Sequence, residues 1–306
     1  MSHLSEFWLL QIFKTAVLAL PLKSAQRLGD YLGLVAFHCY GSRRRIALEN
    51  LRSAFPDKSE AERAKIAKGA FRNYGIALVE LLWFPNLTDK SLRHLVAFRN
   101  LDLMKTAEAR GKGLVMLSGH FGNWELIALA TAHASGYPIT IIVREQSNKR
   151  VSGLLDRHRC LFGNRVVSMG QSVREIIRTL SEGKVVAMAP DQSAAAEGAF
   201  VDFFGRSVAT HRGPALFAIR AGAPVLMGFI MRKPDWTYDV VLEEVKTDDL
   251  AGNSDDDILE LTRRHTALLE KYIRQYPDHW LWMHRRWKHT APSGSGIVET
   301  NPHVDV

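Results

Sequence analysis

The spacing of apolar residues changes near residue 110. Before that point apolar side chains recur at helical spacing, most clearly over Ser59–Trp83, where Ser59 and Glu62 form a plausible capping box. After it, short runs rich in β-branched residues alternate with amphipathic stretches. The pattern therefore predicts a helical N-terminal part, followed by strands and helices in alternation.

Six apolar runs after residue 110 predict strands. They cover Leu114–Leu117, Pro138–Val143, Arg165–Val167, Lys184–Met188, Pro224–Met231 and Tyr238–Val245. The helical stretches among and after them cover Asn123–Ser135, Asn148–Phe162, Gln171–Ser181, Arg212–Ala221 and Asp255–Tyr276. This order is typical of an α/β fold with a mainly parallel central sheet flanked by helices. Because no helix separates the last two strands, we expect an antiparallel hairpin at one edge of the sheet.

The chain shows no internal repeat and no clean linker, so one α/β unit with an N-terminal helical cap is the simplest organisation. We predict N-terminal membrane-associated helices over 1–40 and an α/β domain over 41–290. The remaining residues, 291–306, include a Gly/Ser-rich stretch and are expected to form a disordered tail.

The segment Phe7–Leu22 carries the strongest membrane signal. It is apolar, but Gln11, Lys14 and Thr15 interrupt it on one helical face. A transmembrane helix needs about 20 apolar residues, and this run is shorter. It also lacks the flanking features of a signal peptide. Two interpretations stay open: a core helix, and a helix that lies in, or marginally crosses, a membrane interface.

Composition excludes several classes of protein. Of the 306 residues, 46% are apolar, which is too many for a disordered chain, and the only cysteines are Cys39 and Cys160. Long uncharged apolar runs are missing, so a polytopic membrane protein is excluded. The 40 basic residues against 32 acidic ones give a net charge of +8. That excess favours an acidic partner: nucleic acid, anionic lipid, phosphate or an acidic protein.

His120 is the strongest candidate for chemistry. Residues 114–125 read LVMLSGHFGNWE, so an apolar strand ends just before His120 and a helix begins near Asn123. Open α/β sheets bind their ligands at this end of the strands. An imidazole at neutral pH can accept a proton from a hydroxyl, and a nearby carboxylate such as Glu125 can orient it.

The spacing of His120 and Glu125 is weak evidence by itself. About one such pair is expected by chance in a chain of this composition. A second pair, His265 and Glu270, indeed occurs in the closing helix, where His265 continues an apolar stripe and is interpreted as a core or rim residue.

The segment 118–125, SGHFGNWE, resembles the first motif of the lysophospholipid acyltransferase superfamily, in the branch of the bacterial lipid A biosynthesis acyltransferases. Further segments resemble later motifs of that branch in the same order: Val143-Arg144 with Asn148, Ala189–Gln192, Phe203–Arg206 with the helix start at 209–215, and Trp282–Lys288. Val143 stands where tyrosine is common in the family. The resemblance covers roughly residues 1–290.

The resemblance implies an O-acyltransferase that moves a fatty-acyl chain from a thioester to a hydroxyl of a lipid A precursor or related glycolipid. His120 would be the general base and Glu125 would orient it. Neither a cofactor nor a metal is expected, because acyl carrier protein or coenzyme A brings the acyl chain as co-substrate. The expected substrate-binding residues are Asn123, Arg144, Asp191, Arg206 and Thr210. For Asp191, Arg206 and Thr210, a purely structural role in a cap, loop or turn is the alternative interpretation.

The family also implies a location and partners: the cytoplasmic face of a bacterial inner membrane, an anionic glycolipid, and an acidic carrier protein, without nucleic acid. The segment His279–His289, with three tryptophans and several cations, would then be structural with its basic side chains near the membrane. Two alternatives stay open. The acceptor is a lysophospholipid or a phosphatidylinositol mannoside, or the chain is a non-enzymatic basic module that binds lipid or nucleic acid.

Overall fold

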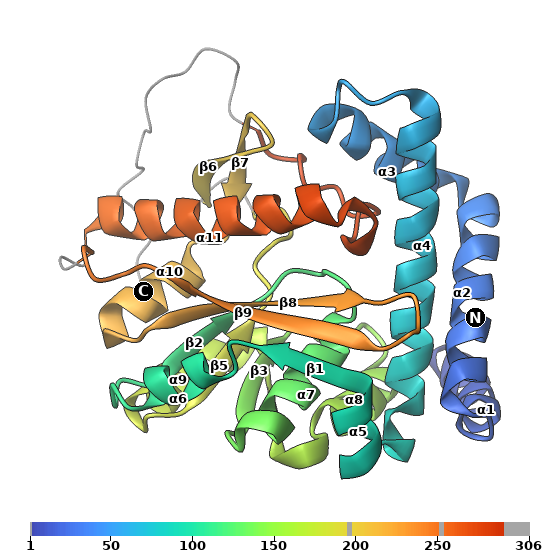
Figure 1. Ribbon diagram of the computed structural model, residues 1–306, viewed down its shortest axis with the longest axis horizontal. Helices are drawn as coiled ribbons and strands as arrows, with labels where there is room; N and C mark the ends of the chain where they lie inside the picture. The colour runs from blue at the N-terminus through green and yellow to red at the C-terminus, as the bar shows by residue number, and fades with distance from the viewer. Residues whose placement is uncertain (1, 195–197, 251–253, 291–306) are drawn as a thin grey trace.

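A computed structural model describes residues 2–194, 198–250 and 254–290 (Figure 1). Its centre is a seven-stranded sheet in the order β1-β9-β8-β2-β5-β3-β4. The strands are β1 (Val96–Arg99), β2 (Leu114–Leu117), β3 (Ile139–Val143), β4 (Arg165–Ser168), β5 (Val185–Met188), β8 (Val225–Arg232) and β9 (Tyr238–Val245). Every neighbouring pair is parallel except β8 and β9. The structure therefore confirms the α/β class and the mainly parallel sheet.

The antiparallel pair β8–β9 is present, but it does not form the edge of the sheet. The edge strand is β1, which runs parallel to β9 and which the sequence pattern does not predict. The reason is local: β1 has four residues, and only Val96 is buried. So short a strand has no apolar alternation that would separate it from the helices around it.

The central strand β2 is buried on both faces, as expected of a parallel strand between helical layers. Its side chains alternate, so that Val115 and Leu117 face one hydrophobic core while Leu114 and Met116 face the other. The first core also takes in α9 (Ser172–Ser181), α10 (Gly213–Ala221) and α11 (Asp255–Gln275). The second takes in α5 (Asp89–Leu95), α6 (Asp102–Glu108) and α7 (Trp124–Ser135).

Four N-terminal helices form the expected cap: α1 (His3–Leu18), α2 (Leu22–Cys39), α3 (Gly41–Ala54) and α4 (Glu60–Trp83). The capping box at Ser59 and Glu62 starts α4, which stands between the sheet and the α1–α2 pair (Figure 1). Within the described ranges, each helix is too short or too polar to cross a membrane. The domain boundaries at residues 40 and 290 stay predictions, and the predicted tail lies outside the described residues.

A hairpin of β6 (Ala199–Phe203) and β7 (Arg206–Thr210) packs against α11 and is not predicted from the pattern. Phe203 pairs with Arg206, so Phe204 and Gly205 form a two-residue turn in which both have positive φ (56° and 71°). Such turns match the twist of the strands they join, and glycine suits one of the two positions. Glu270 of α11 fixes the turn by accepting the Phe204 N–H at 2.6 Å.

Helices α2 and α4 cross at glycines, which bring their backbones unusually close. A Cβ on Gly29 would lie 2.7 Å from both the Gly75 carbonyl oxygen and Ile76 Cα. Backbone atoms of a packed helix cannot give way without separating the helices. We therefore expect Gly29→Ala to lower the free energy of unfolding by about 1–3 kcal/mol, as other overpacked cores do. Chemical denaturation measures this loss.

Gly153→Ala in α8 (Lys149–Arg159) is the matched control, because a Cβ there would meet only Arg157 Nη1 at 3.9 Å. Alanine forms helix better than glycine by about 1 kcal/mol, so this variant should be at least as stable as the natural chain. Equal stability of the Gly29 and Gly153 variants would contradict the close crossing.

Candidate active site

His120 lies where the sequence places it, in the loop between the carboxyl end of β2 and the N-terminus of α7. Asn123 caps that helix, because its side-chain oxygen accepts the Leu126 N–H at 3.0 Å. Ser118 and His279–Leu281 fix the other side of the loop: Ser118 donates its hydroxyl to the Gly228 carbonyl, and Leu281 donates its N–H to the His120 carbonyl. The loop is therefore held from both sides.

Asp191 is the partner of the His120 ring. Its Oδ1 lies 2.7 Å from His120 Nδ1, and its Oδ2 accepts the His120 backbone N–H at 2.8 Å and the Trp280 indole N–H at 2.9 Å. Asp191 follows β5, the parallel neighbour of β2, so the prediction that both residues share one edge of the sheet is confirmed. The carboxylate holds the proton on Nδ1 and leaves Nε2 as the acceptor.

The charges in this pair support each other. Burial disfavours the imidazolium, but the charge and hydrogen bond of Asp191, with a smaller contribution from Glu125, outweigh it and raise the pKa of His120 above its ordinary 6.5. Burial likewise acts against the Asp191 carboxylate, yet His120 and Trp280 hold the pKa of Asp191 below its usual value. Both shifts have the same consequence: Asp191 keeps its negative charge more readily, and His120 holds a second proton more readily, than either group would in water.

Glu125 does not hydrogen-bond to His120, which corrects its expected role as the orienting group. It forms a bidentate ion pair with Arg159 of α8, at 2.8 and 2.6 Å, and Arg159 also contacts Asp156. The reason is geometric: Glu125 is the second residue of α7, and its side chain faces the neighbouring helix α8. Glu125 and Arg159 nevertheless both line the same cavity as His120.

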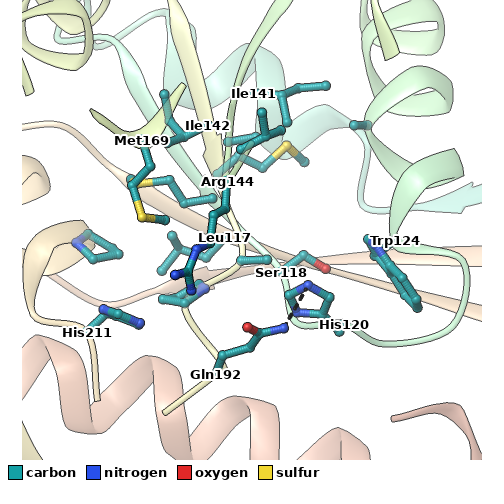
Figure 2. A pocket seen from close by; sticks show the side chains of 18 of the residues that line it. Leu117, Ser118, His120, Trp124, Ile141, Ile142, Arg144, Met169, Gln192 and His211 are labelled. Atoms are coloured by element: carbon teal, nitrogen blue, oxygen red, sulfur yellow. Dashed lines mark hydrogen bonds between the residues drawn. The ribbon is translucent and has the colours of Figure 1, made fainter. Parts of the chain in front are cut away.

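That cavity has a volume of about 670 Å³, and His120 lines it. Its polar lining includes Ser118, Gln192, His211 and His284, and Gln192 Nε2 lies 3.4 Å from His120 Nε2 (Figure 2). Its apolar lining includes Met116, Leu117, Ile127, Ile141, Ile142, Met169, Ile176 and Phe217. The cavity therefore combines a polar side, to which Arg144 adds a positive charge, with a hydrophobic wall (Figure 2).

The expected substrate-binding residues divide between the cavity and the scaffold. Arg144 lines the cavity, and its side chain reaches in from the end of β3 (Figure 2). Asn123 is buried and occupied as a helix cap, and Asp191 positions His120. Thr210 is buried and accepts a hydrogen bond from Arg286. Arg206 donates to Ser53 at 2.9 Å. The structure thus leaves Asn123, Asp191, Thr210 and Arg206 out of the cavity lining, because their polar groups are hydrogen-bonded to other parts of the protein.

Three features of the site are missed by sequence reasoning or are assigned another role. Arg159 has no motif around it, and only the packing of α8 on α7 brings it to Glu125. His284 lines the cavity, and burial lowers its pKa. Trp280 is buried against Asp191. The sequence signal for the last two is the segment His279–His289, whose structural role the burial of Trp280 and Trp282 confirms. The expectation that its basic side chains lie near a membrane is wrong for Arg286, which is 1% exposed and donates to the Ala209 carbonyl.

The second His-x4-acid pair serves no comparable site. His265 is buried in the core, and burial lowers its pKa to about 4, so it stays neutral. Glu270 contacts the hairpin turn and Arg274. The interpretation of His265 as a core residue is confirmed. In the parts of the chain that the structure describes, no group of three or more His, Cys, Asp or Glu side chains is placed to hold a metal ion.

Comparison with known proteins identifies the family of the chain. The chain matches the model of the bacterial lipid A biosynthesis acyltransferases over residues 1–289. It is 30% identical over 276 residues to the lipid A biosynthesis palmitoleoyltransferase of Escherichia coli, covering 89% of this chain and 87% of that one. To the lauroyltransferase of Escherichia coli it is 27% identical over 283 residues, covering 91% and 89%. A shorter match, 26% over 163 residues and 51% of each chain, is to the phosphatidylinositol mannoside acyltransferase of Mycobacterium tuberculosis.

The family match extends over the N-terminal helices, the sheet and the His279–His289 segment, and the relatives are named as acyltransferases. An enzyme is therefore supported over a non-enzymatic binding module. The chain belongs to the bacterial lipid A biosynthesis acyltransferase family and is an O-acyltransferase.

Proposed function

We propose that this protein transfers a fatty-acyl chain from a carrier thioester to a hydroxyl of a lipid A precursor, with His120 as the general base. One observation carries the mechanism. Asp191 binds His120 at Nδ1, which leaves Nε2 on the side of Gln192, and both His120 and Gln192 line a cavity with polar and apolar parts. The relatives' names support the acceptor class.

The transfer needs one base and no covalent enzyme intermediate. His120 Nε2 takes the proton of the acceptor hydroxyl as its oxygen attacks the thioester carbonyl. The tetrahedral intermediate then collapses, its C–S bond breaks, and the imidazolium returns the proton to the leaving thiolate. Arg144 and the backbone N–H groups at the start of α7 are the candidate donors to the oxyanion. Arg144 alternatively binds a phosphate of the acceptor.

The two halves of the cavity suit the two substrates. The hydrophobic wall, which includes Ile141 and Ile142, suits an acyl chain, and the polar side with Arg144 suits a phosphorylated headgroup. We propose acyl carrier protein or coenzyme A as the donor, and the basic surface of the chain is compatible with either. Chain length would follow from the depth of the apolar part.

We further propose that the enzyme works at the cytoplasmic face of the inner membrane. Large apolar side chains of α1 are exposed on its surface, namely Leu4, Trp8, Leu9 and Ile12. Unpartnered apolar side chains on one helix are typical of a segment that lies in a membrane interface. This supports the membrane-associated interpretation of residues 1–40 over the core-helix alternative.

The acceptor is tested by lipid mass spectrometry of a strain that lacks the gene. The proposal predicts a lipid A species short of one acyl chain, restored by the natural gene and not by a His120→Ala copy. The alternative acceptors remain relevant because half of the chain also resembles a phosphatidylinositol mannoside acyltransferase. Normal lipid A, together with an underacylated mannoside or an accumulated lysophospholipid, would show that the acceptor is the alternative one.

Removing the base tests the proton transfer. His120→Ala should lower kcat by about 10²–10⁴-fold, because the acceptor hydroxyl then loses its proton only to water. The assay follows acyl transfer from a thioester to lipid A precursor with purified protein. His265→Ala is the control, since it removes a histidine of the same His-x4-acid spacing from the core. It should lower stability but not the kcat of the folded fraction. An unchanged kcat for His120→Ala would exclude this mechanism.

The partner of His120 is tested by the pH profile. The base must be neutral to accept a proton, so activity is lost as the pH falls through the raised pKa of His120. Asp191→Asn removes the charge that raises this pKa, so the acidic limb of kcat/KM should move to lower pH. Turnover at the optimum should fall by about 10²-fold or more, because the ring loses its orienting carboxylate.

Glu125→Gln is the matched comparison for Asp191→Asn. Glu125 raises the pKa of His120 through its charge, without touching the ring. The acidic limb of kcat/KM in Glu125→Gln should therefore also move to lower pH, but by less than in Asp191→Asn. A larger shift for Glu125→Gln than for Asp191→Asn would restore Glu125 as the orienting group.

A further inference from the structure

A carboxylate outside the cavity is bound to the catalytic loop. Glu80 of α4 is 1% exposed and does not line the cavity. Three side chains donate to it: Gln26 at 2.6 Å, Asn123 at 2.5 Å and Tyr238 at 2.7 Å. These donors come from α2, from the loop before α7 and from β9, so Glu80 joins three separate parts of the fold.

The cluster is complete in hydrogen bonds. Burial raises the pKa of Glu80, while its three donors and the charge of Arg232 oppose that effect. Burial and the neighbouring Glu80 raise the pKa of Tyr238 well above its usual value, so its hydroxyl remains a donor. A buried carboxylate that loses its donors destabilises the fold strongly. The positions of Gln26, Asn123 and Tyr238 therefore depend on one another through Glu80.

Asn123 connects this cluster to the catalytic loop. Its Oδ1 caps α7 at the Leu126 N–H, and its Nδ2 donates to Glu80. An Asn amide can flip, and only one orientation places the oxygen on the helix end. Glu80 favours that orientation, because its Oε2 accepts hydrogen bonds from the Asn123 nitrogen and the Tyr238 hydroxyl.

The cap lies three residues after His120. The loop between them is held on its other side by the 279–281 segment, where Gly122 donates its N–H to the His279 carbonyl at 2.7 Å. Gly122 has a φ of 57° and no room for a Cβ beside the Ile230 carbonyl. The loop therefore has one fixed path only while both of its sides are bound.

We propose that Glu80 is a positioning residue that acts through Asn123 to hold the His120 loop in its productive geometry. This inference rests on the proposed role of His120 as the base. Misplacing a catalytic group by about 1 Å can cost about 10²-fold in rate even when the substitution lies away from the chemistry. Glu80 touches neither the cavity nor the ring of His120, so its loss should affect kcat rather than substrate binding.

Two substitutions of Glu80 and one control test the proposal. Glu80→Leu removes all three acceptor contacts and should lower the kcat of the folded fraction by about 10–100-fold, with KM for both substrates unchanged. Glu80→Gln keeps one side-chain oxygen for Asn123 and Tyr238 but replaces the charged acceptor by a neutral, weaker one, so its loss of kcat should be smaller than that of Glu80→Leu, about 3–10-fold. Val79→Ala truncates the neighbouring buried residue of α4 and should lower the melting temperature alone. Wild-type kcat in Glu80→Leu, or an equal loss in Val79→Ala, would overturn the proposal.

A double-mutant cycle tests the route through Asn123 and remains decisive if Glu80→Leu does not fold. If Glu80 acts through Asn123, adding Glu80→Gln to Asn123→Ala should cause little further loss of kcat. Independent losses that multiply in the double variant would show that Glu80 does not act through the cap.

Hydrogen exchange gives a readout that does not depend on the reaction. Amides of residues 120–126 should exchange faster in Glu80→Gln than in the natural chain and in Val79→Ala. If the natural protein acylated no lipid A precursor, the proposed function would be wrong. The exchange rates of residues 120–126 in the three proteins would still test whether Glu80 positions the loop. Unchanged exchange in residues 120–126 would contradict that role.

Discussion

The site depends on the contact between the Asp191 carboxylate and the His120 ring. Asp191 is 5% exposed, and its two oxygens accept three hydrogen bonds. The donors are the His120 ring Nδ1–H, the His120 backbone N–H and the Trp280 indole N–H. A buried carboxylate is stable only when its oxygens are paired in this way. The backbone N–H and the ring of His120 bind the same carboxylate. Asp191 therefore fixes both the tautomer and the orientation of the imidazole ring, and Nε2 is left free for the substrates.

The fold supplies this contact through strand order. Strands β2 and β5 are parallel neighbours, so the residues after them emerge at the same edge of the sheet although 71 positions separate His120 from Asp191. Both faces of β2 are packed, which leaves the loop at its end as the place where a side chain meets solvent and ligand. The C-terminal segment then closes over the pair with Trp280, and α4 supports the loop from the other side through Glu80 and Asn123.

The sequence predicts the parts of this arrangement that are local. The strand–loop–helix around His120, the cap at Asn123 and the shared edge with Asp191 follow from apolar runs and from the rule for parallel strands. The partner of His120 does not, because spacing favours Glu125 while the helix turns that side chain toward Arg159. Pairings between distant elements, such as Glu80 with Asn123 or Glu125 with Arg159, leave no periodic signal. Four-residue strands such as β1 are too short to leave one.

The central claim is that Asp191 holds the proton of His120 on Nδ1 and raises its pKa, so that Nε2 acts as the base. ¹⁵N NMR of histidine-labelled protein, with the His120 signals assigned by comparison with His120→Ala, measures both properties in one pH titration. The account predicts a neutral ring with the proton on Nδ1 and a pKa above the ordinary 6.5. A neutral ring protonated on Nε2, or a pKa below 6.5, would contradict it.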